Sequence, residues 1–266
     1  MITHQVCKLH EPCPLEDEVQ YVLRKALRGT SISPEEFPDV AGISSDAWAA
    51  CLAGKGDAAT LELASIALKL HAPALLSLAT YQPIVPQIQG VYRCDMSFDG
   101  ERVNAWIIRD ENTCLVFDAG YEPSHIADLV TNLGAAPVDL FITHEHRDHI
   151  GGITALAPHL KKHWNLPVGQ TQSFGSLTVS AFDLSGHYNP STAYLIRGLS
   201  RNLCVVGDAL FAGSIGGCKD PFHYDLALRL LKQNILSLPD DTILLPGHGP
   251  ATTVAQEKKS NPFFAS

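Results

Sequence analysis

The stretch Thr143-His144-Glu145-His146-Arg147-Asp148-His149-Ile150-Gly151-Gly152 contains three histidines and an aspartate within six residues. It follows an apolar run from Val138 to Ile142 that predicts a strand. His144 and His146 stand two apart, so in an extended backbone both side chains point to one side. The two glycines let the chain turn tightly into a helix predicted from Gly152 to Ala157. Because imidazole and carboxylate groups are ligands of divalent transition metals, the stretch predicts a metal site at a strand end.

Three further ligand types stand later in the chain, each beside a glycine and just after a predicted strand. They are His187, Asp208 and His248, which follow strands predicted around 177–182, 203–206 and 242–245. Ligands at strand ends converge on one edge of a sheet. A single histidine of this kind is better explained by a surface turn, but the cluster and the later residues together predict two neighbouring metal positions. Asp118, at another strand end, is either an acceptor that orients a ligand imidazole or a turn carboxylate.

The chain changes character near residues 81–86. Before this point the apolar residues follow helical spacing, as in Val19 to Leu27 and Leu61 to Leu70. After it come strands predicted at Val91 to Phe98, Arg102 to Ile108 and Cys114 to Phe117, and a helix capped by Ser124. We therefore expect an N-terminal helical domain at 1–85 and a catalytic α/β domain at 86–266. Strands first and interleaved helices later predict a layered sandwich with helices outside two sheets.

The composition excludes some classes of protein. The net charge of −9 gives no electrostatic footprint for nucleic acid or an anionic membrane. The seven cysteines form no Cys-x-x-Cys pair, and the sequence shows no signal peptide and no long apolar run. We expect reduced thiols in a cytoplasmic protein with no membrane contact.

The order of these residues resembles the metallo-β-lactamase superfamily over roughly residues 87–266. Within it, the segment from Gly207 to Gly216 is similar to glyoxalase II-like hydrolases, and so is the tail from Leu238 to Phe263. The resemblance implies an α/β fold, the four-layer αββα metallo-β-lactamase-like sandwich, preceded here by a small all-α bundle. The true β-lactamases usually have a cysteine where Asp208 stands, which disfavours lactam hydrolysis.

The resemblance also implies roles for the candidate residues. His144, His146 and His187 would hold a first metal, Asp148, His149 and His248 a second, and Asp208 would bridge the two. Two divalent ions are implied, with zinc expected and iron or manganese as alternatives. Asp148 and Asp208 are the expected catalytic residues, because their carboxylates can orient a metal-activated hydroxide toward a carbonyl. A thiolate leaves with little protonation, since a thiol pKa is about 8.5, so a thioester such as an S-2-hydroxyacyl-glutathione, or a related acyl ester, is the expected substrate.

Three departures from the family pattern surround the expected substrate mouth. The histidine loop reads Gly186-His187-Tyr188-Asn189-Pro190 instead of Gly-His-Thr-Pro-Gly, the segment after Asp208 ends in Gly216-Gly217-Cys218 instead of Gly-Arg, and the loop from Cys218 to Tyr224 is shorter than usual. The substrate-binding residues are therefore unknown from the sequence. Cys218 has no recognisable histidine base and is not expected to be a nucleophile.

Residues 15–80 weakly resemble a Cro/repressor-type helix-turn-helix bundle. The segment in the place of the recognition helix, Ser44 to Leu52, contains no lysine or arginine, and residues 1–85 contain six basic and ten acidic residues. Because phosphate contacts supply most non-specific DNA affinity, we do not expect nucleic acid as a partner. A homodimer contact through these helices, a cover over the catalytic mouth, or a packing role alone all remain open.

Two alternatives to a metallo-hydrolase follow from the same residues. A mononuclear iron persulfide dioxygenase on this fold would use His144, His146, His187 and Asp208 and leave the second group of ligands empty. A DNA-binding regulator with a metal-binding domain would use the helical region instead.

Overall fold

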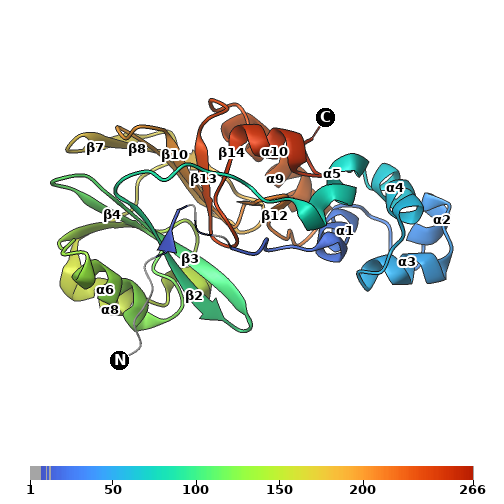
Figure 1. Ribbon diagram of the computed structural model, residues 1–266, viewed down its shortest axis with the longest axis horizontal. Coiled ribbons are helices and arrows are strands. Elements are labelled where there is room, and N and C mark those ends of the chain that lie inside the picture. Colours follow the sequence, from blue (N-terminus) through green and yellow to red (C-terminus); the bar gives the residue numbers. More distant parts are fainter. Residues whose placement is uncertain (1–6, 10, 12, 266) are drawn as a thin grey trace.

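The computed structural model describes residues 7–9, 11 and 13–265 as a four-layer αββα sandwich with a group of helices at one end (Figure 1). This confirms the predicted fold class. Each sheet has six strands, and each buries one face against the other sheet and one face against helices. The chain alternates strands and helices because apolar residues switch between a period of two and a period of 3.6.

The first sheet has the order β1-β2-β3-β4-β5-β6. Its strands are β1 (Cys7–Lys8), β2 (Val91–Phe98), β3 (Glu101–Arg109), β4 (Cys114–Phe117), β5 (Val138–Phe141) and β6 (Leu160–Trp164). Strands β4, β5 and β6 run parallel, which requires crossover helices. The first crossover is α6 (Pro123–Asn132), which covers the outer face of the sheet together with α8 (Ile153–Leu156).

The second sheet has the order β14-β13-β10-β9-β8-β7. Its strands are β7 (Thr171–Phe174), β8 (Leu177–Asp183), β9 (Thr192–Arg197), β10 (Leu203–Gly207), β13 (Ile243–Pro246) and β14 (Thr252–Thr253). Helices α9 (Pro221–Asn234) and α10 (Val254–Ser260) cover its outer face, and β11 (Leu210–Phe211) and β12 (Ser214–Ile215) form a separate hairpin. Strands β10 and β13 run parallel, so their carboxyl ends lie at the same edge.

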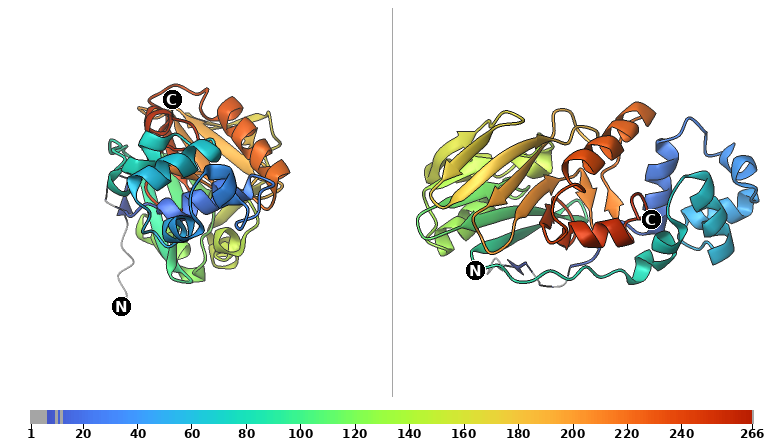
Figure 2. Two further views of the ribbon diagram at one scale, coloured as in Figure 1. Left: turned by 90° about the vertical axis from the view of Figure 1, so that its right-hand side faces the viewer. Right: turned by 90° about the horizontal axis from the view of Figure 1, so that it is seen from above.

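The N-terminal helices lie at one end of the sandwich (Figure 2). They are α1 (Val19–Arg28), α2 (Phe37–Ala41), α3 (Ser45–Leu52), α4 (Ala58–Ala67), α5 (Ala72–Ser77) and the 3-10 turn η1 (Leu78–Thr80). The C-terminal end of α1 packs closely on α9. A Cβ on Gly29, the residue after α1, would lie 2.3 Å from the ring of Tyr224 on α9. No helix in the described part of the chain is long and apolar enough to span a membrane.

The structure differs from the sequence prediction at several elements. The helix expected to be capped by Ser124 begins at Pro123, so Ser124 lies inside its first turn. Strands β1, β6 and β7 were not predicted from the sequence. Strand β6 lacks an apolar pattern, because it lies at the sheet edge and its lysines and histidine are exposed. Strand β1 pairs with β2, so the chain enters the first sheet before it enters α1. The domain boundary at residues 85 and 86 and the homodimer contact remain predictions.

Candidate metal centre

The candidate ligands lie where strands of both sheets end. His144 and His146 follow β5, and α7 (Arg147–Ile150) carries Asp148 and His149. From the second sheet, His187 follows β8, Asp208 follows β10 and His248 follows β13. The structure brings all seven side chains together in the two groups that the family resemblance implies, with Asp208 common to both.

The first group consists of three imidazoles and one carboxylate. Nδ1 of His146 lies 3.0 Å from Nε2 of His144 and 3.2 Å from Nε2 of His187. Oδ2 of Asp208 lies 3.8 Å from the same nitrogen of His144 and 3.7 Å from that of His187. The four donor atoms therefore surround one small volume.

The second group combines two imidazoles with two carboxylates. Nε2 of His248 lies 3.3 Å from Oδ2 of Asp148 and 3.2 Å from Oδ2 of Asp208. Nε2 of His149 lies 3.7 Å from Oδ2 of Asp148 and 3.2 Å from Oδ1 of Asp208. Asp208 thus has Oδ1 near His149 and Oδ2 near His248. Since Oδ2 also lies near the first group, Asp208 joins the two groups of ligands.

Hydrogen bonds outside the centre fix which ring nitrogens face it. His187 donates from Nδ1 to the carbonyl of Gly217 at 2.7 Å, and His248 donates from Nδ1 to the carbonyl of Arg102 at 2.7 Å. In the neutral form that binds a metal, each ring has its single N–H at Nδ1, so Nε2 of both rings presents a lone pair to the centre.

His144 is oriented in the same way through Thr143. The Thr143 hydroxyl donates its single proton to Asp118 at 2.9 Å, so it can only accept from Nδ1 of His144, 3.0 Å away. Nε2 of His144 therefore also presents a lone pair, toward a neighbouring ring nitrogen. Converging lone pairs repel one another unless a proton or a cation lies between them.

Asp118 orients the buried ring of His149. Nδ1 of His149 lies 2.8 Å from Oδ2 of Asp118, and the backbone N–H of Thr143 donates to Oδ1 at 2.7 Å. Such an acceptor fixes the tautomer of a ligand imidazole and raises its basicity. Asp118 has a φ of 61°, a left-handed conformation that aspartate tolerates better than most residues.

Two buried atoms show that the protein groups alone do not satisfy this centre. Nε2 of His149 and Oδ1 of Asp208 have no hydrogen-bond partner, since the 3.2 Å contact between them lacks hydrogen-bond geometry. Unsatisfied buried polar atoms are costly. The donor types, the lone-pair directions and these two atoms all fit divalent metal ions bound at both groups.

The pKa values of the protein groups follow from the same geometry. Burial lowers the pKa of His144 to about 3, and the neighbouring ring of His149 adds to the effect. Burial also opposes charge on His149, but the carboxylates of Asp208 and Asp118 outweigh it and raise the pKa to about 10. The pKa of Asp208 lies well below its usual value, because His149 and His248 outweigh its burial. The centre thus holds its carboxylates ionised.

Two residues that support the centre, Asn104 and Trp106, have no sequence pattern that would predict this role. Asn104 donates from its side chain to the carbonyls of Pro246 and Gly249, at 3.1 and 2.9 Å, and Trp106 donates to the carbonyl of Pro246 at 3.0 Å. These bonds hold the loop that carries His248. In sequence both residues are ordinary members of strand β3, and only the contact between the sheets gives them this role.

Cys218, which lies beside the ligand loops, has the properties of an unreactive thiol. Burial raises the pKa of the Cys218 thiol to about 11, and the thiol donates a weak hydrogen bond to the carbonyl of Gly216, at 3.7 Å. A protonated, buried thiol is a poor nucleophile.

A cavity of about 410 Å³ opens over the ligand groups. His146, Asp148, His187, Asp208 and His248 form its floor, and its walls include Phe98, Arg147 and Phe211. Glu16 and Lys25, from before and within α1, complete the walls. The sequence did not predict these two residues as part of the site.

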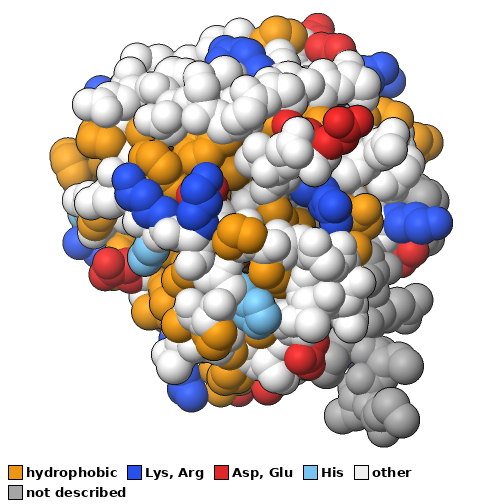
Figure 3. Space-filling model, turned by 90° about the vertical axis from the view of Figure 1, so that its left-hand side faces the viewer, with side chains coloured by type: hydrophobic (Ala, Val, Ile, Leu, Met, Phe, Trp, Pro, Cys, Tyr) orange, Lys and Arg blue, Asp and Glu red, His pale blue; other side chains and the backbone are white. Residues whose placement is uncertain are grey.

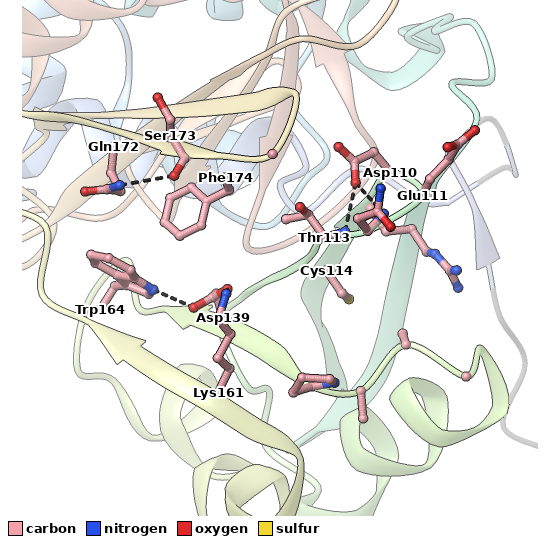
Figure 4. Close-up of a pocket in the computed structure, with 17 residues that line it drawn as sticks. Asp110, Glu111, Thr113, Cys114, Asp139, Lys161, Trp164, Gln172, Ser173 and Phe174 are labelled. Carbon is pink, nitrogen blue, oxygen red and sulfur yellow. Dashed lines mark hydrogen bonds and ion pairs between the residues drawn. The ribbon is translucent and has the colours of Figure 1, made fainter.

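A separate cavity of about 520 Å³ lies at the opposite ends of β4 and β5 (Figure 4). Its buried carboxylate, Asp139, is already satisfied, because the Trp164 indole donates to it at 2.7 Å and Lys161 at 3.4 Å. The face of the molecule at this end carries basic, acidic and histidine side chains scattered among hydrophobic and uncharged ones (Figure 3). None of the described residues that line this cavity belongs to either group of metal ligands, so it is not part of the candidate centre.

The chain is similar to proteins of one superfamily. Residues 98–171 match the family model of the metallo-beta-lactamase superfamily. The probable metallo-hydrolase YqgX of Bacillus subtilis is 27% identical over 201 residues, 61% of this chain and 92% of that protein. The hydroxyacylglutathione hydrolase GloC of Haemophilus influenzae is 27% identical over 196 residues, 59% of this chain and 90% of that protein. The crystal structure of TTHA1623 in a di-iron-bound form aligns with a TM-score of 0.50 at 25% identity, over 64% of this chain and 98% of that one.

Proposed function

We propose that this chain is a two-metal hydrolase of thioesters or related acyl esters, with an S-2-hydroxyacyl-glutathione as one candidate substrate. The observation that carries the proposal is the position of Asp208 between two complete groups of ligands. The similarity to a hydroxyacylglutathione hydrolase supports the substrate class.

The seven residues would hold two divalent ions, of which zinc is the expected metal and iron or manganese the alternatives. When bound, such ions lower the pKa of water from about 16 to roughly 7 and polarise a carbonyl. The chain contributes the rest. Asp148 and Asp208, both buried, are ionised and can accept a hydrogen bond from the attacking water, which orients its lone pair toward the carbonyl carbon.

The walls of the cavity would position the acyl group. The buried rings of the ligand histidines limit access to one side, and Phe98 and Phe211 provide apolar surface beside them. A thiolate leaving group needs little protonation, because a thiol pKa lies near 8.5. For a thioester, no general acid is therefore required among the residues that line the cavity.

A single-iron persulfide dioxygenase would need only the first group of ligands. The orphaned atoms of His149 and Asp208 favour occupation of the second group as well. Metal quantification on freshly purified protein, combined with a thioester-hydrolysis assay, separates the two. We expect about two metals per chain and hydrolysis that is lost on chelation and restored by added metal. One iron per chain with oxygen uptake on glutathione persulfide would exclude the hydrolase.

The variant Asp208→Asn tests the shared ligand directly. It should lose metal from both groups and lose hydrolysis, because the amide supplies neither the charge nor the second oxygen. The exposed Asp46→Asn is the matched control and should retain both. Full metal content in Asp208→Asn would contradict the assignment.

A further inference from the structure

Helix α1 places a fixed positive charge in the wall of the cavity above the metal ligands. The Lys25 ammonium donates to the carbonyl of Ile215 at 2.9 Å and to the carboxylate of Asp17. It also lies over the ring of Phe211, 4.8 Å from the ring centre. These contacts hold Nζ at one place beside the β11–β12 hairpin.

The ammonium keeps capacity for a further partner. Lysine has three N–H donors, and the two contacts above use two of them. Asp17 is shared, because its Oδ2 also accepts from the Ser214 hydroxyl at 2.5 Å. The side chain of Lys25 is 19% exposed, and the cavity is the space that it lines. A third N–H can therefore reach a ligand in the cavity without breaking the existing bonds.

Outside the ligand groups, basic side chains outnumber acidic ones among the residues that line the cavity. Apart from the ligand groups, the charged residues that line it are Lys25, Arg147 and Glu16. Glu16 lies at the His248 side, with its Oε2 3.8 Å from Nδ1 of that ring. Lys25 lies instead near the loop of Gly217, where an added Cβ would be 4.0 Å from its Cε.

We propose that Lys25 is a specificity-determining residue that binds a carboxylate carried by the substrate at a distance from the scissile carbonyl. This inference rests on the proposed function for the identity of the scissile bond. It gives the N-terminal helical region a role in substrate recognition, since α1 forms part of the cavity wall.

The test uses the metal-loaded full chain and two probes of equal size, 3-(acetylthio)propanoate and its uncharged amide. The variant Lys25→Gln removes the charge but keeps N–H donors for Asp17 and Ile215. We expect it to raise KM for the carboxylate probe about tenfold, with kcat unchanged and the amide probe unaffected. Lys25→Arg should retain the preference for the carboxylate. The control Lys55→Gln removes an exposed charge from the same helical region and should change nothing.

A binding measurement separates this inference from the proposed function. The probes are the corresponding thioether ketones, in which a methylene group separates the carbonyl from the sulfur, as carboxylate and as amide. Calorimetry should show about tenfold weaker binding of the carboxylate to Lys25→Gln, and equal binding of the amide. One outcome is that the wild type hydrolyses neither thioester and still binds the carboxylate ketone about tenfold more tightly than Lys25→Gln does. In that case the proposed function fails and the role of Lys25 stands.

Two results would overturn the role of Lys25. One is an equal change for the charged and uncharged probes, which would mean that Lys25 only holds α1 in place. The other is no change for either probe. If Lys25→Gln does not fold, the wild type decides, because it must bind the carboxylate ketone about tenfold more tightly than the amide.

Discussion

Asp118 and His149 form a buried pair in which the carboxylate oxygen lies 2.8 Å from Nδ1 of the ring. The two residues come from different segments, one after β4 and one on α7. Asp118 also accepts from the backbone and the hydroxyl of Thr143, so one carboxylate fixes the orientation of His149 and, through that hydroxyl, of His144. One side chain thereby supports both ligand groups.

Asp118→Asn should weaken metal binding by about 10- to 100-fold, because the amide is a poorer acceptor for Nδ1 and does not raise the basicity of the ring. Asparagine tolerates the left-handed backbone, so the fold should persist. Competition with a chromophoric chelator measures the affinity. Asp99→Asn changes another aspartate with positive φ, in an exposed turn, and should leave the affinity as it is.

Gly247→Ala should remove metal from the centre while the protein stays folded. A Cβ at this position would lie 2.1 Å from Oδ1 of Asp208 and 2.6 Å from Cε1 of His149, so it must displace both side chains. Metal content and circular dichroism are the measurements. Gly42→Ala, in a left-handed position with open space around it, should cost about 1 kcal/mol of stability and retain the metal. Equal metal content in the two variants would refute the steric role of Gly247.

Glu257 should make the stability depend on pH. Burial raises its pKa above 4.5, despite hydrogen bonds from Asn261, Thr252, Gly213 and Tyr81. A raised folded-state pKa means that its contribution is complete below the unfolded pKa and is lost as the pH rises through the folded value. The wild type should therefore lose stability relative to Glu257→Gln as the pH rises from 4.5 through the raised folded-state pKa. Urea unfolding across this range measures the difference, and exposed Glu62→Gln should show none.

Gly29→Ala should destabilise the contact between α1 and α9. The new Cβ would lie 2.3 Å from the ring of Tyr224, an overlap that we expect to cost about 1–3 kcal/mol. The double variant Gly29→Ala/Tyr224→Leu should lose less stability than the sum of the single variants, because the smaller side chain leaves room for the methyl group. Additive losses would show that the two residues do not interact.

Local patterns in the sequence predicted many of the helices and strands and the order of the ligands. Strands β2 and β4 have the predicted bounds, Val91–Phe98 and Cys114–Phe117. A segment that mixes apolar and polar residues (β2) and a short apolar run (β4), each bounded by turn residues, are both local signals. The positions of His187, Asp208 and His248 just after strands could also be predicted. A glycine stands directly before each of these residues and marks the end of the strand. Local spacing sufficed to predict a metal centre of two groups.

Only the tertiary structure decided what surrounds that centre. The contact of Lys25 with Ile215 joins residues 190 positions apart, and that of Asn104 with Pro246 joins residues 142 apart. Neither pair shares a local pattern, because their proximity depends on how the sheets pack and on where α1 docks. Periodicity reports which face of an element is buried, whereas the partner across that face is set by packing of the whole chain. The ligands could therefore be read in order from the sequence, but the wall that faces the substrate could not.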